Sequence, residues 1–309
     1  MAVVECAGIA IFCSIKAKSV STQPRLKAPI EEEISIMRMI DTHFHIGVMP
    51  HEYLHILGLT ELETVIVPSD QMIPDYSTLD MVRDHFDRIL TEKTENAHDF
   101  GIFNLFLAIT YPMWGLPLSQ LDDGIKLLEE YVDHPRVVGI GEAGMDTVTV
   151  EHEEVVFKAM VDFAKDHDLP IIIHTPPPRH SPYKGREKGD YDKRKVMERI
   201  IEILSISGID PNKVVLDHIN KETIDMARDY GSWIGLSCCL DKLSGPEVVE
   251  FYQEYGPNKF IVNSEWGYSG GGNRSVPKVV VDMKAANAPR EDIKKIVYDN
   301  AKACFSLPV

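Results

Sequence analysis

The stretch from Met39 to His45 contains two histidines separated by one residue, directly after an apolar pair. If residues 38–45 form a β-strand, its period of two places Asp41, His43 and His45 on the same face. The two imidazoles would then project side by side from the carboxyl end of the strand. This spacing predicts that both can bind one metal ion.

Four further apolar runs also end on residue types that bind metals. They close on Glu142 (after residues 137–141), His174 (after 171–173), His218 (after 214–217) and Glu265 (after 260–264). One such residue could be an ordinary polar strand end, satisfied by a backbone hydrogen bond, but five strand ends together indicate a shared site. We therefore predict a metal centre with one or two divalent ions. Mixed imidazole and carboxylate ligands suit Zn, Mn, Fe or Co, and Mg is also compatible.

These side chains can meet only if the runs before them are neighbouring parallel strands. Eight short apolar runs, rich in β-branched residues, fit this description: residues 38–45, 63–68, 102–109, 136–141, 169–174, 213–217, 233–237 and 259–263. Segments with helical periodicity alternate with them, for example residues 74–93 and 151–166. The alternation predicts right-handed βαβ units, and eight units predict an α/β fold of the (β/α)8 TIM-barrel type.

An open doubly wound sheet is the alternative fold for this alternation. That fold would normally show a glycine-rich phosphate loop after its first strand, and residues 45–48 do not form one. We expect residues 37–309 to be a single barrel domain. Residues 1–36 are either a loose tail or start-site artefact, or a short helix that closes the bottom of the barrel; the apolar stretch Ala2 to Ile15 within them carries Glu5 and has no basic residues before it, which makes a poor signal peptide, and it is too short to span a membrane.

Composition limits the classes of partner. The formal net charge of −16 opposes binding to a phosphate backbone, which rewards Lys and Arg, although a local basic patch could survive this sum. The five cysteines show no zinc-finger spacing, and their odd number fits reduced thiols in the cytoplasm. We expect no membrane partner, and the oligomeric state stays open.

The order of these motifs resembles the TatD-like metal-dependent hydrolases of the amidohydrolase superfamily. Residues 40–45 look like the D-x-H-x-H that opens the family pattern, and residues 141–146 are similar to its G-E-x-G-[LI]-D. The resemblance runs from about Met39 to the C-terminus. It implies a set of metal ligands in which Glu142 bridges two ions: His43, His45, Glu142, His174 and His218.

The eighth strand departs from the family pattern. The family places an Asp there within E-T-D-x-P, whereas this chain has Asn263-Ser264-Glu265-Trp266-Gly267. The resemblance implies that Glu265, one methylene longer, is both a ligand and the general base. His218 is followed by Ile219-Asn220 and not by the Cys-Phe-Ser-Gly common in the nucleases of the family. These departures indicate a divergent branch whose substrate need not be DNA.

Two acidic residues adjoin the expected ligands. Asp41 and Asp217 are candidates for orienting the imidazoles through hydrogen bonds. For Asp41, a plain turn residue at the strand end is the alternative.

Two loops could contact a substrate. The loop after His174 carries Arg179, His180 and Lys184 and should lie over the mouth of the barrel, which favours an anionic substrate; a solvated charged loop is the alternative. Trp114, in the apolar loop 110–117, could contact substrate or simply pack the loop.

The leading hypothesis is a metal-dependent hydrolase that activates water to cleave a small, anionic ester, lactone, amide or phosphoester. A metal-dependent deoxyribonuclease is the second hypothesis. The third, from another class, is a non-catalytic binding or assembly protein that retains the metal.

Overall fold

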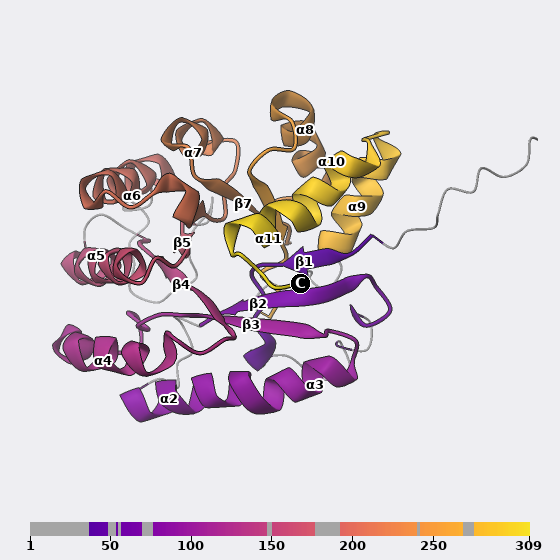
Figure 1. Ribbon diagram of the computed structural model, residues 1–309. Coiled ribbons are helices and arrows are strands. Elements are labelled where there is room, and N and C mark those ends of the chain that lie inside the picture. Colours follow the sequence, from indigo (N-terminus) through magenta and orange to yellow (C-terminus); the bar gives the residue numbers. More distant parts are fainter. Residues whose placement is uncertain are drawn as a thin grey trace, which may run out of the picture. The chain divides into compact units, whose positions relative to one another are not determined.

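Short aliphatic runs form eight parallel strands in the part of the chain that the computed structural model describes (Figure 1). The strands are β1 (Met39–Asp41), β2 (Leu62–Pro68), β3 (Asn104–Ile109), β4 (Val137–Gly144), β5 (Ile171–His174), β6 (Val214–Leu216), β7 (Trp233–Ser237) and β8 (Phe260–Asn263). Each strand pairs in parallel with the next one in sequence. A parallel bridge between Phe44 and Trp266 joins the two ends of the sheet. The predicted (β/α)8 barrel is thereby confirmed.

The described residues are 37–48, 54, 57–69, 77–146, 150–176, 192–239, 242–267 and 275–309. The segment 1–36 and the basic loop residues Arg179, His180 and Lys184 lie outside them. Within the described ranges, no helix is both long enough and apolar enough to cross a lipid bilayer.

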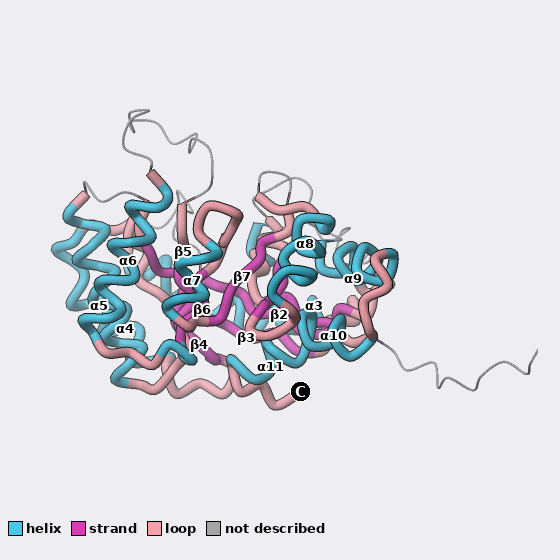
Figure 2. The backbone as a smooth tube through the Cα atoms, turned by 90° about the horizontal axis from the view of Figure 1, so that it is seen from above, coloured by secondary structure: helices cyan, strands magenta, loops and turns pink. Residues whose placement is uncertain are grey.

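Amphipathic helices connect the strands and lie around them (Figure 2). They are α2 (Leu79–Arg88), α3 (Thr94–Asp99), α4 (Leu121–Tyr131), α5 (Glu151–Asp166), α6 (Lys193–Ser207), α7 (Ile224–Tyr230), α8 (Gly245–Tyr255), α9 (Ser275–Ala285), α10 (Arg290–Lys294) and α11 (Asn300–Cys304). Helix α5 has the predicted bounds. Within the periodic range 74–93, residues 79–93 form α2 and the π-helical turn Ile89–Lys93 that continues it into α3.

Alternation along each strand separates the apolar side chains into two layers. In β2, Val65 and Val67 belong to the large cluster that includes the helices, whereas Ile66 belongs to a second cluster. The second cluster also receives buried side chains from six other strands, as well as Phe305 and Leu307 near the C-terminus. A barrel interior packed in this way is a solid core, so functional side chains belong at the strand ends.

The first strand is shorter than predicted. The prediction that it runs to His45 was wrong, because β1 ends at Asp41. The carboxylate oxygen Oδ1 of Asp41 accepts a hydrogen bond of 3.1 Å from the backbone N–H of His43, which turns the chain out of the strand. The chain remains fixed beyond this turn, since the N–H of Phe44 donates to Ile66 in β2 and that of His45 donates to Trp266. Both histidines therefore lie where the barrel closes.

Candidate metal centre

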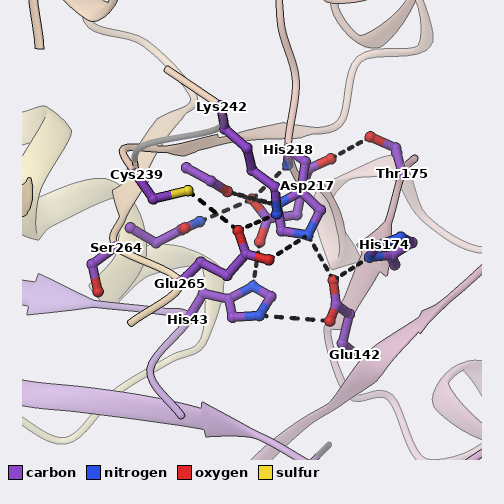
Figure 3. A network of polar contacts seen from close by, with 12 residues as sticks. His43, Glu142, His174, Thr175, Asp217, His218, Cys239, Lys242, Ser264 and Glu265 are labelled. Atoms are coloured by element: carbon purple, nitrogen blue, oxygen red, sulfur yellow. Dashed lines mark hydrogen bonds and ion pairs between the residues drawn. The ribbon is translucent and has the colours of Figure 1, made fainter. Parts of the chain in front are cut away.

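Side chains from five strand ends converge at the carboxyl end of the barrel (Figure 3). His43 and His45 follow β1, Glu142 belongs to β4, His174 ends β5, His218 follows β6 and Glu265 follows β8. His43, His45, Glu142 and His218 are buried, and the side chain of His174 is only 12% exposed. Residues far apart in sequence are thus collected because parallel strands end on the same side of a barrel.

Glu142 lies at the centre of the cluster, and its two oxygens face different histidines. Oε1 is 2.7 Å from Nδ1 of His174 and 2.8 Å from Nε2 of His218. Oε2 is 3.6 Å from Nε2 of His43. Glu142 belongs to two groups of residues with metal-ligand spacing. One group also contains His43 and His45, and the other also contains His174 and His218. One carboxylate between two sets of imidazoles has the arrangement that a bridging ligand needs.

The two histidines after β1 point at the same place. Nε2 of His43 and Nε2 of His45 are 3.0 Å apart, and the rings meet edge to face. Two imidazole nitrogens can face each other at this distance only with a proton or a cation between them. The pair therefore directs both ring nitrogens at one point, as two ligands of one ion would be placed.

Asp217 fixes several members of the cluster at once. Its Oδ2 lies 2.7 Å from Nδ1 of His43, which directs the other ring nitrogen, Nε2, towards His45 and Glu142. Its Oδ1 accepts hydrogen bonds from the backbone N–H of His218 at 2.8 Å and from Nδ2 of Asn263 at 2.8 Å. A β-carbon on Gly235 of β7 would overlap Oδ1, so this close approach requires glycine there.

Asp41 is placed differently from its predicted role. It is buried, and its Oδ1 accepts hydrogen bonds from the backbone N–H groups of His43 and Ser264, each at 3.1 Å. Among the described residues, its carboxylate is thus hydrogen-bonded to the chain at His43 and Ser264, after β1 and β8, and not to an imidazole ring. Burial raises the pKa of Asp41 to about 6, against the effect of the hydrogen bonds from Ser264 and His43. Asp41 therefore holds the main chain where the barrel closes.

His174 lies between two carboxylates. Its Nδ1 faces Glu142, and its Nε2 is 2.9 Å from Oδ1 of Asp146. The ring of Trp114 meets the ring of His174 edge to face, with centroids 5.7 Å apart. The indole N–H of Trp114 donates to Glu153, which also accepts the backbone N–H of Asp146. Trp114 therefore stands beside the cluster, as its place beyond the third strand suggested.

Glu265 lies at the edge of the cluster, next to His218 and Lys242. Its Oε1 is 3.9 Å from Nε2 of His218, and its Oε2 is ion-paired with Nζ of Lys242. Burial would raise the pKa of Glu265, but Lys242, His218 and His43 lower it to about 2. The carboxylate is therefore ionised at neutral pH.

Two of these residues have left-handed backbone conformations that side chains other than glycine rarely adopt. His218 has a φ of 58° and Glu265 has a φ of 47°. Such conformations cost about 1–3 kcal/mol each and are concentrated at functional sites. Here they turn the chain directly after β6 and β8 and aim both side chains at Glu142 and its partners.

The electrostatics of the cluster favour a cation. Burial alone would lower the pKa of His43, but the charges of Glu142 and Asp217 outweigh it and raise the pKa to about 9. Burial is likewise outweighed at His174, where Glu142 and Asp146 raise the pKa to about 10. The pKa of Glu142 is held well below its usual range, despite burial, by His43 and His174. Negative charge that stabilises protonated imidazoles also stabilises a divalent cation, so the residues present fit one.

Asp146 and Lys242, near the cluster, carried no predicted role, and Lys193 was expected only as one of the basic residues of the loop after His174. Asp146 is the last residue of the motif at residues 141–146, so the motif itself held a signal for it. Lys193 and Lys242 follow no apolar run that would mark them. Only the contacts of their Nζ atoms place them at the site.

Comparison with known proteins connects this arrangement to a family. The family model described as TatD related DNase matches residues 40–306. A protein of Methanocaldococcus jannaschii, described as an uncharacterized metal-dependent hydrolase, is 32% identical over 270 residues, which are 87% of this chain and 100% of that protein.

Solved structures share the fold. A TatD-like protein from Archaeoglobus fulgidus superposes with a TM-score of 0.65 at 23% identity, over 87% of this chain and 100% of the other. A dihydroorotase from Campylobacter jejuni gives a TM-score of 0.59 at 14% identity, over 88% and 84% of the two chains. At these identities the likeness concerns the barrel alone.

Proposed function

The chain belongs to the family of TatD-related DNases and is a metal-dependent hydrolase of that type, and on this premise we propose that it cleaves a small anionic ester, lactone, amide or phosphoester. The observation that carries the proposal is the position of Glu142 between two groups of histidines. A carboxylate shared in this way suits two divalent ions that act on one substrate.

In this proposal His43 and His45 would hold one ion and His174 and His218 the other, with Glu142 as a ligand available to both. A bound divalent ion lowers the pKa of a coordinated water and polarises the bond to be cleaved. Asp217 keeps the ring of His43 in one orientation through the hydrogen bond at Nδ1.

Glu265 has the proposed role of proton acceptor. Its carboxylate is ionised, lies beside His218 and is largely shielded from solvent, with its side chain 14% exposed. A general base must be within hydrogen-bond reach of the proton that it removes, and Glu265 stands on the wall of the space that the metal ligands surround (Figure 3). Trp114, beside His174, has the proposed role of contacting the substrate.

The first experiment is elemental analysis of protein purified without added metal or chelator. We expect one to two equivalents of a divalent transition metal, lost in His43→Ala. The same preparation is then assayed on a panel of anionic esters, lactones, amides and phosphoesters. Absence of metal, with none taken up on titration, would contradict the metal centre. Full metal content without turnover across the panel would favour a binding or assembly protein.

A metal-dependent deoxyribonuclease is the second candidate, because the description of the matching family names a DNase. The net charge of −16 opposes binding to the phosphate backbone. The test is hydrolysis of single-stranded DNA at several salt concentrations. Turnover that falls steeply with added salt, in protein that cleaves none of the small substrates, would favour this candidate.

A further inference from the structure

Two buried lysines lie at the carboxyl end of the barrel, and their ammonium groups are satisfied in different ways. Nζ of Lys193, at the start of α6, donates to Oγ1 of Thr175 at 2.9 Å, to the carbonyl of Pro176 at 2.5 Å and to the carbonyl of His218 at 2.9 Å. An ammonium group has three N–H donors, so Lys193 is saturated. Its role is to brace the chain after β5 and β6.

Lys242 is not saturated by the residues that the structure describes. It lies between β7 and α8, its side chain is 6% exposed, and among the described residues its ammonium group pairs only with the carboxylate of Glu265. One carboxylate oxygen leaves donor capacity on the ammonium group. Buried N–H donors are normally paired, because leaving one unpaired is costly. The side chain therefore has room for a further acceptor.

The position of Lys242 connects this donor to the metal centre. Glu265 meets Lys242 through Oε2, while its Oε1 faces Nε2 of His218. The close-up shows the ammonium group above the space between His43, His218 and Glu265 (Figure 3). Substrates of TIM-barrel enzymes bind at this end, among the loops that follow the strands, and Lys242 lies on the loop after β7.

We propose that Lys242 binds an anionic oxygen of the substrate, from a phosphate or a carboxylate, beside the metal centre. This inference rests on the proposed hydrolase function and specifies its substrate class. A lysine is a compact point charge whose three donors can serve Glu265 and a substrate oxygen together. In a chain of net charge −16, a buried cation at the site supplies the local attraction that an anionic substrate needs.

The test is calorimetric titration of the metal-loaded full chain with inorganic phosphate and, separately, with acetate. We expect Lys242→Met to weaken binding of the preferred anion roughly 10- to 100-fold, the range for losing a hydrogen bond from a charged group. Lys242→Arg should retain most of the affinity because it keeps the charge. The anion whose affinity falls more in Lys242→Met, phosphate or acetate, identifies the chemical group that supplies the oxygen.

Lys221→Met is the matched control, since Lys221 pairs with Glu250 on the exposed surface. Removing Lys242 alone leaves Glu265 without its partner and could unfold the protein. The comparison is therefore repeated between Glu265→Gln and the double variant Lys242→Met/Glu265→Gln, which lacks both charges. The inference would be overturned if removing Lys242 left the affinity for both anions unchanged at equal metal content. This holds for Lys242→Met against the natural protein and for the double variant against Glu265→Gln.

A kinetic measurement separates this inference from the proposed function. Lys242→Met should raise KM for anionic substrates by a larger factor than KM for a neutral ester such as p-nitrophenyl acetate. An equal effect on both substrates would show that Lys242 only positions Glu265. Loss of anion binding in a protein without turnover would support the role of Lys242 and contradict the hydrolase.

Discussion

Nδ1 of His43 lies 2.7 Å from Oδ2 of Asp217, although 174 positions separate the two residues in sequence. This contact fixes which nitrogen of His43 faces the cluster. We expect Asp217→Asn, which keeps the side-chain volume, to weaken metal affinity about 10- to 100-fold, as is typical when a ligand loses its orienting carboxylate. Competition with a chromogenic chelator measures the change.

Asp225→Asn is the control for this substitution, because Asp225 pairs with Arg194 on the exposed surface. Gly235→Ala is an independent check, since its added methyl group would overlap the Asp217 carboxylate. If metal affinity is unchanged in both Asp217→Asn and Gly235→Ala, Asp217 does not act on His43.

A second prediction concerns the shared carboxylate. If Glu142 joins two ions, Glu142→Ala should lose both, whereas His174→Ala should lose one and keep the other. His43→Ala should also lose metal. The fold should remain, because these side chains lie beyond the packed layers of the barrel. Elemental analysis measures the metal content, and circular dichroism measures whether the fold is retained. Unfolding of the single variants would instead show that these residues are structural.

A third prediction concerns Glu265. Glu265→Gln removes the proton acceptor but keeps the shape of the side chain. Because general base catalysis contributes about 10²- to 10⁴-fold, kcat should fall by at least ~100-fold while most of the metal is retained. Steady-state kinetics on a substrate found in the panel, with metal content measured on the same sample, tests this. A rate equal to that of the natural protein would remove Glu265 as the base.

Metal affinity should depend strongly on pH. Carboxylate neighbours raise the pKa of His43 to about 9 and that of His174 to about 10, so both rings hold protons at neutral pH in the metal-free protein. The ion must displace these protons, and affinity should therefore increase as pH rises towards 9. Each displaced proton corresponds to about a tenfold gain per pH unit.

Titrations at pH 6, 7 and 8, in buffers with different ionisation enthalpies, count the protons released on metal binding. Binding that releases no protons and has the same affinity at each pH would contradict the arrangement of His43 and His174 beside carboxylates.

Lys193, whose three N–H donors all have acceptors, should be important for stability. Lys193→Met keeps the buried aliphatic chain but deprives the carbonyls of Pro176 and His218 of their donor. Unpaired buried groups cost about 1–3 kcal/mol each, so the loss of a donor at two carbonyls should lower the free energy of unfolding by about 2–6 kcal/mol. Urea denaturation measures it. Lys195→Met, at an exposed position on the same helix, is the control; equal midpoints for the two variants would contradict the bracing role.

Local patterns were sufficient to predict the architecture. Each of the eight predicted strands overlaps an observed one, and α5 has the predicted bounds. The reason is that periodicity and β-branched composition act over a few residues. The ends of elements were less predictable. Beyond Asp41, a side-chain contact to the backbone of His43 outweighs the alternating pattern and ends β1.

The sequence by itself determined the types of ligand in the candidate site and the strand ends that present them. A histidine or carboxylate after an apolar run must emerge at the edge of the sheet, whatever else the chain does. Tertiary structure alone decided how these groups meet: the two oxygens of Glu142 divide the histidines, and Asp217 bonds to His43. It also distinguished Lys193, whose ammonium group has three acceptors, from Lys242, whose ammonium group pairs with Glu265 alone among the described residues. Such pairings depend on closure of the barrel, which brings together residues that no local pattern relates.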